Sequence, residues 1–245
     1  MSPFRESDAT TSSSRFVRRL RDGVQPQLRL DPHRVPREAV DEGKLRDYYR
    51  GKNGGMTDAQ LDVLFARRFA YQKAHAATNM RAIVALAHQY GIPLASHDDT
   101  TEQNVADAIS DRVAVAEFPT TLEAARGLHE AGIGILMGAP NVVRGGSHSG
   151  NIAAVDLARE GLLDILSSDY IPSSLLMAAL QLPRDVPAID LPSAVRTVTK
   201  TPAEAVGLAD RGEIATGKRA DVIRVHVARG IPVVRSVWRE GQRVA

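Results

Sequence analysis

The chain of 245 residues contains no cysteine. This absence excludes a disulfide scaffold, a thiolate metal site and a cysteine nucleophile, so any metal must be held by histidine and carboxylate side chains. Long hydrophobic runs are also missing, because no apolar stretch approaches the roughly 20 residues that cross a bilayer. The N-terminus lacks the apolar centre of a secretory signal. We therefore expect no membrane partner and a cytoplasmic location.

A large excess of charge of one sign is absent as well. Lysine and arginine number 31 against 29 aspartates and glutamates, a formal net charge of +2. Because the basic residues are scattered between acidic ones, nothing requires a nucleic-acid partner. A hydrophobic fraction of 43% with 24% charged residues is typical of a globular protein. We expect chemistry on a small molecule.

The first forty residues are rich in Ser, Arg and Pro and show no helical or alternating period, so we expect them to be irregular. After them Thr57 can cap a helix, and apolar residues recur at spacings of three and four. These apolar residues are Leu61, Leu64, Phe65 and Phe69. The pattern predicts a helical pair that ends near Gly91.

From there four short β-branched runs alternate with helix-compatible segments. The runs are IPLASHDD, VAVAEFPTT, IGILMGAPN and LLDILSSDY. Their spacing predicts parallel βα units, whose strand ends meet on the face where active sites are built. Two helical stretches follow, and then turn glycines separate short β-rich pieces that predict a small β appendage. The turn glycines are Gly212, Gly217, Gly230 and Gly241.

Three of the predicted strands end in side chains that can bind metal. His97, Asp98 and Asp99 follow the first run, Glu117 ends the second, and Asp169 ends the fourth. A shared edge would let Asp169 converge with His97, and these ligand types suit zinc, manganese or iron. The alternative, equally weighted, is that the two adjacent aspartates cap the next helix and His97 is a hydrogen-bonded edge residue. For Glu117 we favour fixing its own loop over binding metal.

A second group of polar residues lies between positions 138 and 161, where two glycines and an arginine precede a helix expected near Ile152. Amides at a helix start and a guanidinium favour an anion, so we predict a phosphate cradle. Its residues are Arg144, Gly145, Gly146, Ser147, Ser149 and Asn151. His148 could act as a general acid or orient a phosphate. The alternative is a flexible loop that caps the helix, and the Lys-Ser/Thr ending of a P-loop is missing.

These blocks resemble the amidohydrolase superfamily. The stretches LASHDDTT, AEFPTTLEAA, LMGAPNVVRGGSHSGN and GLLDILSSDYIPSSLL are similar in detail to its diphosphatases of phosphonate catabolism, over roughly residues 41–244. The resemblance implies part of a (β/α)8 TIM-like barrel of the metal-dependent hydrolase type over 41–208, with β-sandwich strands over 209–245. It further implies hydrolysis of alpha-D-ribose 1-methylphosphonate 5-triphosphate to the 5-phosphate and diphosphate, a step of the carbon–phosphorus lyase pathway.

The same resemblance implies roles for individual residues. His97 would be a metal ligand, and Asp169 would be a ligand or the base that takes a proton from the attacking water. The cofactor would be a divalent metal, zinc before manganese or iron. The stretch from Arg144 to Asn151 would contact substrate phosphate or phosphonate, with His148 as a catalytic candidate. Asp98, Asp99 and Glu117 would orient the ligands, and a homo-oligomer is compatible with this pattern.

The chain also departs from the superfamily pattern. It lacks a first barrel strand that ends in a histidine pair or His-x-Asp. Asp31 and His33 are at most a degenerate remnant of a strand end that the family carries. Only four βα units are convincing, about half of a barrel. We therefore expect residues 1–40 to be a non-native segment from a truncated or shifted reading frame, which the upstream DNA would test. Hydrolysis of a C–N bond in a phosphorylated substrate, or a non-catalytic remnant, are the alternative functions.

Overall fold

A computed structural model of the chain describes residues 28–29, 46, 50, 55–147 and 150–245. The chain divides into two compact units, Leu30–Gly91 and, as the other, Ile92–Ala245 together with Met1–Arg29. The division at Gly91 lies inside the stretch 41–208 that the sequence assigned to one barrel segment. No helix in the described part of the chain is long and apolar enough to cross a membrane.

The first unit contains one long helix, α3, Asp58–Tyr90. As predicted, Thr57 caps its start, and it does so in a reciprocal capping box with Gln60. The helix ends at Gly91, whose left-handed backbone (φ 62°) satisfies the last turn. Arg46 and Arg50 also have helical backbone, and the rest of the expected first helix lies outside the described residues.

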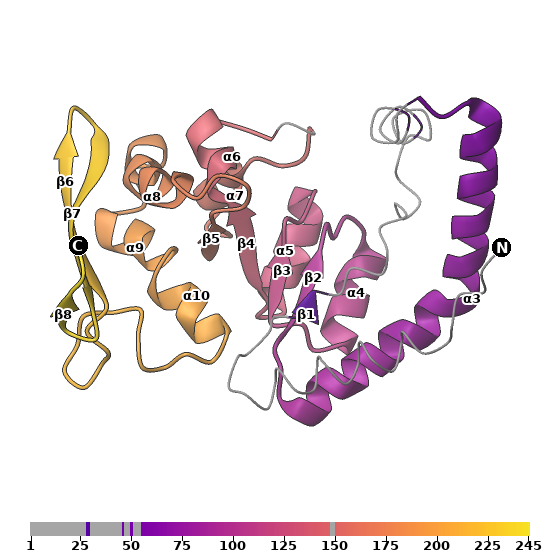
Figure 1. Cartoon of the computed structure of the whole chain (residues 1–245), viewed down its shortest axis with the longest axis horizontal. Helices are drawn as coiled ribbons and strands as arrows, with labels where there is room; N and C mark the ends of the chain where they lie inside the picture. The colour runs from indigo at the N-terminus through magenta and orange to yellow at the C-terminus, as the bar shows by residue number, and fades with distance from the viewer. Residues whose placement is uncertain (1–27, 30–45, 47–49, 51–54, 148–149) are drawn as a thin grey trace. The chain divides into compact units, whose positions relative to one another are not determined.

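The second unit is built on a sheet of five parallel strands in sequential order, β1 to β5 (Figure 1). The strands are β1, Leu28–Arg29; β2, Leu94–His97; β3, Val115–Glu117; β4, Gly134–Gly138; and β5, Ile165–Ser167. Strands β2 to β5 are the four predicted runs, and the parallel pairing confirms the βα interpretation. The expectation that the first forty residues are irregular is wrong at Leu28–Arg29. These two residues pair with Leu94 and Ala95, because β2 would otherwise leave its edge groups unpaired.

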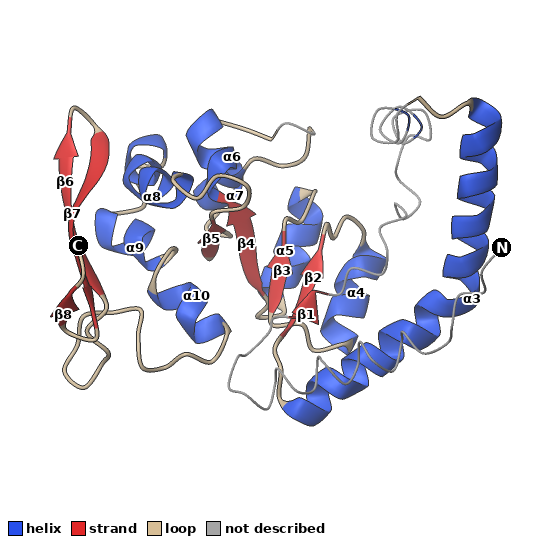
Figure 2. Ribbon diagram, in the orientation of Figure 1, coloured by secondary structure: helices blue, strands red, loops and turns tan. Residues whose placement is uncertain are grey.

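Helices separate the successive strands (Figure 2). They are α4, Glu102–Ser110; α5, Leu122–Glu130; α6, Ala139–Arg144; α7, Ala154–Arg159; α8, Ser174–Asp185; α9, Leu191–Arg196; and α10, Lys200–Ala205. Thr101 and Thr121 cap α4 and α5 through their hydroxyls, in the short loops that follow β2 and β3. The sequence pattern predicted a helix near Ile152 and missed α6, which begins at the strand end with Pro140 in its first turn.

Side-chain alternation gives the sheet two different faces. The buried residues on one face are Leu94, Ser96, Ala116, Ile135, Met137 and Leu166. On the other face the register places His97 opposite Glu117, and Glu117 opposite Leu136. The sheet therefore brings His97 and Glu117 together at its carboxyl edge.

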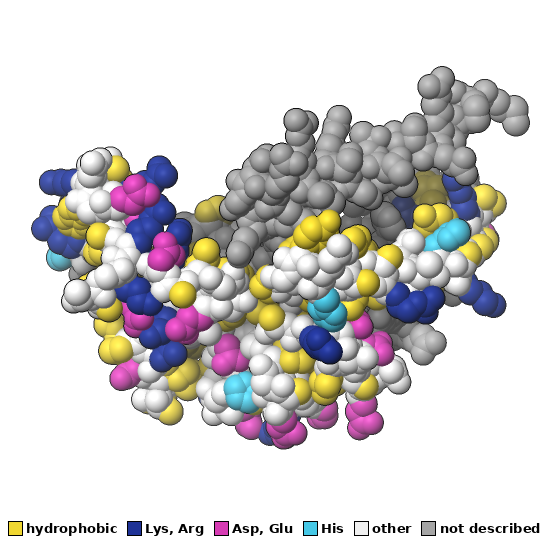
Figure 3. Space-filling view, turned by 90° about the horizontal axis from the view of Figure 1, so that it is seen from below, with side chains coloured by type: hydrophobic (Ala, Val, Ile, Leu, Met, Phe, Trp, Pro, Cys, Tyr) yellow, Lys and Arg dark blue, Asp and Glu magenta, His cyan; other side chains and the backbone are white. Residues whose placement is uncertain are grey.

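The chain ends in an antiparallel sheet of β6, Val222–Ala228, β7, Ile231–Arg239, and β8, Gln242–Arg243. Both hairpins have two-residue loops, Arg229-Gly230 and Glu240-Gly241, with positive φ at each residue. Positive φ at both positions is the signature of a type I′ turn, so two of the predicted turn glycines have their physical reason. On the left of Figure 3, over this sheet, Lys and Arg side chains lie close to Asp and Glu.

Candidate functional site

His97 ends β2 with a side chain that is 20% exposed. Its Nδ1 lies 3.2 Å from Oδ1 of Asp98. The neutral tautomer with its proton on Nδ1 would donate to this carboxylate and keep the lone pair of Nε2 for a metal. Asp98 therefore lies beside the imidazole, and its role in orienting the histidine stays a prediction.

Glu117 approaches the same imidazole from the neighbouring strand. Its carboxylate is 8% exposed, and Oε2 lies 3.9 Å from Nε2 of His97. This separation is too long for a hydrogen bond. It is short enough for both atoms to bind one ion, because zinc lies about 2 Å from each of its ligand atoms. His97 and Glu117 fit a metal as a pair, while the described residues contain no group of three or more such side chains arranged for one.

Phe118 is a residue of this site that the sequence analysis missed. Its ring meets the His97 ring edge-on, with centroids 5.4 Å apart. Its backbone is left-handed, at φ 57°, which is costly for a bulky L-residue. No pattern in the sequence signals this conformation, because it depends on the tertiary fold around the end of β3.

Asp169 follows β5 and comes to the same edge of the sheet. Its backbone is also left-handed, with φ 48°. A Cβ atom built on Gly138 would lie 3.1 Å from Oδ2 of Asp169 and 3.4 Å from Cε1 of Phe118. Asp169 and Phe118 therefore share the space above the end of β4. Phe118 also contacts the His97 ring, and the convergence of His97 and Asp169 on one metal stays a prediction.

Asp99 has a local role in the described structure. It is buried, and Ser96 Oγ donates a hydrogen bond to its carboxylate. The side chain that caps α4 is Thr101, so the alternative in which the two aspartates cap this helix is wrong. The buried Ser167 Oγ at the end of β5 has no hydrogen-bond partner among the described residues, and alternation places it on the face that carries His97.

The glycine pair after α6 has a different geometry from the predicted cradle. Gly145 ends α6 in the left-handed conformation, and its N–H donates to Val142. The N–H of Gly146 donates to the Asn141 carbonyl. Further along, the N–H groups of Ile152 and Ala154 donate to Thr120 and to the Asn141 side chain. These four amides are engaged within the protein, so anion binding by this segment falls to side chains.

Arg144 is the cationic side chain of that segment. It is exposed, and its Nη1 lies 3.3 Å from the Tyr170 hydroxyl, beside Asp169 in the sequence. Of the other predicted phosphate contacts, the structure describes Ser147 and Asn151. His148 and Ser149, the predicted general acid and one of the phosphate contacts, lie outside the described residues.

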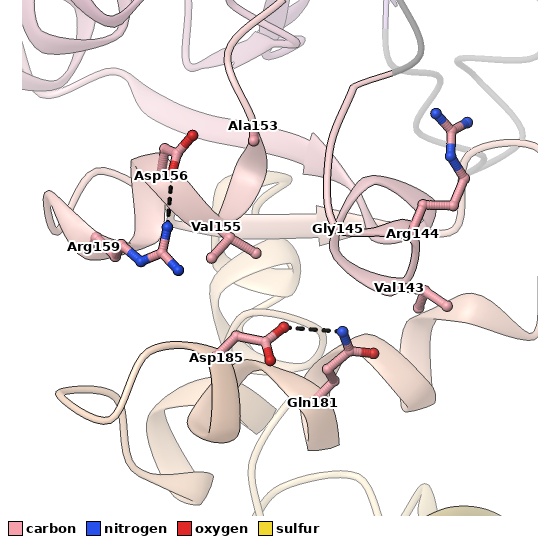
Figure 4. A pocket seen from close by; sticks show the side chains of 9 residues that line it. All are labelled: Val143, Arg144, Gly145, Ala153, Val155, Asp156, Arg159, Gln181 and Asp185. Carbon is pink, nitrogen blue, oxygen red and sulfur yellow. Dashed lines mark hydrogen bonds and ion pairs between the residues drawn. The ribbon is translucent and has the colours of Figure 1, made fainter.

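A hollow of about 410 Å³ lies between α6, α7 and α8. Figure 4 shows the Asp156–Arg159 ion pair and the Gln181–Asp185 hydrogen bond on its walls, with the Arg144 side chain directed away from them. Because these charged groups already have partners, we assign this hollow no ligand.

Comparison with known proteins supplies the family. The sequence model of the amidohydrolase family matches residues 36–244 of this chain. The chain is 47% identical over 209 residues to the alpha-D-ribose 1-methylphosphonate 5-triphosphate diphosphatase of Escherichia coli (strain K12). That alignment covers 85% of this chain and 55% of the enzyme, so the chain spans about half the length of this relative.

Solved structures with the same fold are more distant in sequence. An amidohydrolase from Thermotoga maritima MSB8 aligns with a TM-score of 0.51 and 19% identity, over 82% of this chain and 59% of the other. An uncharacterized protein aligns with a TM-score of 0.51 and 20% identity, over 67% and 48%. These likenesses agree with the predicted partial barrel. On the family match and the 47% identity, the chain belongs to the amidohydrolase family.

Proposed function

We propose that this chain carries part of the active site of a metal-dependent diphosphatase. The substrate would be alpha-D-ribose 1-methylphosphonate 5-triphosphate, and the products its 5-phosphate and diphosphate. The observation that carries the proposal is the 47% identity, over 85% of the chain, to an enzyme with this name. The reaction breaks the anhydride bond between the α and β phosphates, so it needs an activated water, a base and cations around the phosphates.

His97 and Glu117 are the residues that we assign to the metal, with Asp169 as a further ligand or the base. The support is the 3.9 Å separation of His97 Nε2 and Glu117 Oε2 and the orienting contact of Asp98 on Nδ1. Zinc suits this nitrogen and carboxylate set, with manganese or iron as alternatives. When bound, a divalent ion lowers the pKa of a water molecule and offsets charge on phosphoryl oxygens.

Asp169 is the candidate base. Its carboxylate is positioned above Gly138 at the sheet edge, and a carboxylate there can take the proton that water loses as it attacks phosphorus. Arg144, held near Tyr170, would donate charge-assisted hydrogen bonds to phosphate oxygens. Ser147 and Asn151 add polar side chains to the same segment. Gly145 and Gly146 would contribute by shape, because their amides are engaged.

Phosphorus NMR of the reaction mixture tests this assignment. The purified chain with zinc is expected to convert the triphosphate into 5-phosphate and diphosphate signals. Asp169→Asn is expected to slow this conversion by about 10²- to 10⁴-fold, the range for loss of a general base. His97→Asn is expected to lose most of the rate, whereas His226→Asn, on the C-terminal sheet, is the matched control.

A folded chain that leaves all phosphorus signals unchanged would contradict the diphosphatase assignment. Release of an amine from a phosphorylated amide or deaminase substrate by the same chain would favour the C–N alternative instead.

A further inference from the structure

We propose that Thr120 is a positioning residue that joins the loop holding His97 to the segment that follows Arg144. The inference deepens the proposed function, because these are the two parts assigned to the metal and to phosphate. Thr120 lies in the loop after β3 and makes no direct contact with the side chains assigned to the metal or to phosphate. Its contacts reach two other loops, the loop after β2 and the segment before α7.

The first link runs through hydroxyl groups. Thr120 Oγ1 lies 2.7 Å from Thr100 Oγ1, and Thr100 Oγ1 donates to the Asp98 carbonyl at 3.0 Å. A threonine hydroxyl has a single proton. Because that of Thr100 is used on Asp98, Thr120 must be the donor between the two threonines.

This relay ends at a residue in an uncommon conformation. Asp98 has φ 57°, and it presents its carboxylate to Nδ1 of His97 from that backbone. The hydrogen bond from Thr100 to the Asp98 carbonyl helps to hold this conformation, which otherwise costs free energy. Thr120 therefore acts on the orientation of His97 through Thr100 and Asp98.

The second link runs through the backbone of Thr120. Its N–H donates to the Asp99 carbonyl at 2.9 Å, and its own carbonyl accepts from the N–H of Ile152 at 3.1 Å. Ile152 ends the segment that begins at Arg144. The neighbouring Thr121 adds a hydroxyl bond to the Thr100 carbonyl at 3.0 Å, which fixes the two strand-end loops against each other.

The first test is amide hydrogen exchange of the full chain, which needs no turnover. Thr120→Val keeps the side-chain shape and removes the donor, and Thr120→Ser keeps the donor. Thr120→Val is expected to speed exchange by about threefold to tenfold in the peptide containing Asp98–Thr101, the effect of losing one net hydrogen bond. The peptide containing Ile152 should be unchanged, because Val keeps the backbone carbonyl that accepts from the Ile152 N–H. Thr120→Ser should exchange like the wild type.

Thr197→Val is the matched control. The Thr197 side chain is buried and donates to the Ala194 carbonyl within its own helical stretch, so its hydroxyl takes no part in the links of Thr120. Its substitution should leave both peptides unchanged. Exchange in the Asp98–Thr101 peptide that is unaffected by Thr120→Val, or raised equally by Thr197→Val, would overturn the proposal.

Nitrogen NMR of the histidine side chains supplies a readout that a merely structural role would not move. The wild type and Thr120→Ser are expected to keep the His97 proton on Nδ1, against Asp98. Thr120→Val is expected to populate both tautomers, because Thr100 loses the bond from Thr120 and holds the Asp98 backbone less firmly. An unchanged tautomer in Thr120→Val would contradict positioning, whether or not the chain hydrolyses the triphosphate.

Discussion

At the scale of residues, three strand ends carry the same uncommon backbone. Asp98, Phe118 and Asp169 have φ of 57°, 57° and 48°, directly after β2, after β3 and near the end of β5. A left-handed conformation costs a non-glycine residue about 1–2 kcal/mol, and less for aspartate. Such strain tends to collect at functional sites. Its presence at the strand ends that carry His97, Glu117 and Asp169 agrees with the proposed location of the site.

Gly138 provides a test at this scale. Gly138→Ala is expected to displace the Asp169 carboxylate, because the new Cβ would meet Oδ2 at 3.1 Å. A shift of this kind is expected to lower the rate of diphosphate release by about tenfold to 100-fold. The melting temperature should change little, since an exposed carboxylate can move aside.

Gly134→Ala is the matched control, in the same strand, where a Cβ would meet the Ala114 carbonyl at an ordinary 3.7 Å. Parallel measurement of diphosphate release and thermal unfolding separates the two effects. Equal rates in the two alanine variants would argue against a role for Asp169.

The residues whose position the sequence predicted well are those placed by local spacing. His97 and Asp169 follow β-branched runs, and parallel pairing alone puts such ends at one edge. Sequence analysis did not identify Phe118 and Thr120, because their roles depend on contacts between loops. The cradle amides were assigned from a helix start, but Asn141 and Thr120 take the N–H groups of Ala154 and Ile152.

At the scale of elements, local sequence signals identified most boundaries. Thr57 and Gly91 bracket α3 as expected, because capping requires residues of these types at these positions. The β-branched runs became β2 to β5. Sequence could not find β1, because two residues carry no period, or α6, because six residues do not complete two turns. β1 depends on its pairing with β2, and α6 depends on its packing against α8 and β4.

Asp190, the N-cap of α9, gives a pH dependence at this scale. Hydrogen bonds from Ser193 hold the pKa of Asp190 below its model-peptide value of 3.8. A carboxylate with a lowered folded pKa stabilises the protein above its unfolded pKa, and the contribution fades as pH falls through the folded pKa. The melting temperature of Asp190→Ala is therefore expected to lie below that of the wild type near neutral pH.

This difference should shrink as the pH is lowered below 3.8, because the protonated cap loses its advantage. Asp190→Asn keeps a neutral acceptor for the Ser193 N–H, so its melting temperature should show no such step. A wild-type advantage over Asp190→Ala that persists at the lowest accessible pH would count against this account.

The β6–β7 hairpin provides a second test on an element. Arg229 has φ 51° at the first loop position of a type I′ turn, where Asn is preferred before Gly230. Arg229→Asn is expected to raise the free energy of unfolding by about 0.5 kcal/mol, measured by urea denaturation. Arg224→Asn, in the middle of β6, should not stabilise, because Asn is disfavoured within strands. The reverse order of stabilities would contradict the turn assignment.

At the scale of the whole molecule, the chain combines part of a parallel barrel sheet with a small antiparallel sheet. Sequence reasoning reached this architecture through the βα alternation and the turn glycines. Sequence analysis did not predict the unit boundary at Gly91, because the periodicity of apolar residues does not show which elements pack together. The homo-oligomer stays a prediction, and the exposed Ile223, Val227 and Val234 on the C-terminal sheet are compatible with it.

The zinc affinity of the whole chain depends on a few side chains. His97 and Glu117 form a two-residue group, so we expect this chain to hold zinc weakly and to exchange it readily. The rate of hydrolysis should then follow the free zinc concentration.

The most direct test of the central claim is the initial rate of diphosphate release from the ribose triphosphate as zinc is added to the chelator-treated chain. We expect no release without metal and a saturable rise with zinc. His97→Asn should need at least about tenfold more zinc, since removing a ligand weakens binding at least as much as removing a residue that supports one. Release that ignores zinc, or an identical zinc dependence in His97→Asn, would contradict a metal-dependent diphosphatase built on His97.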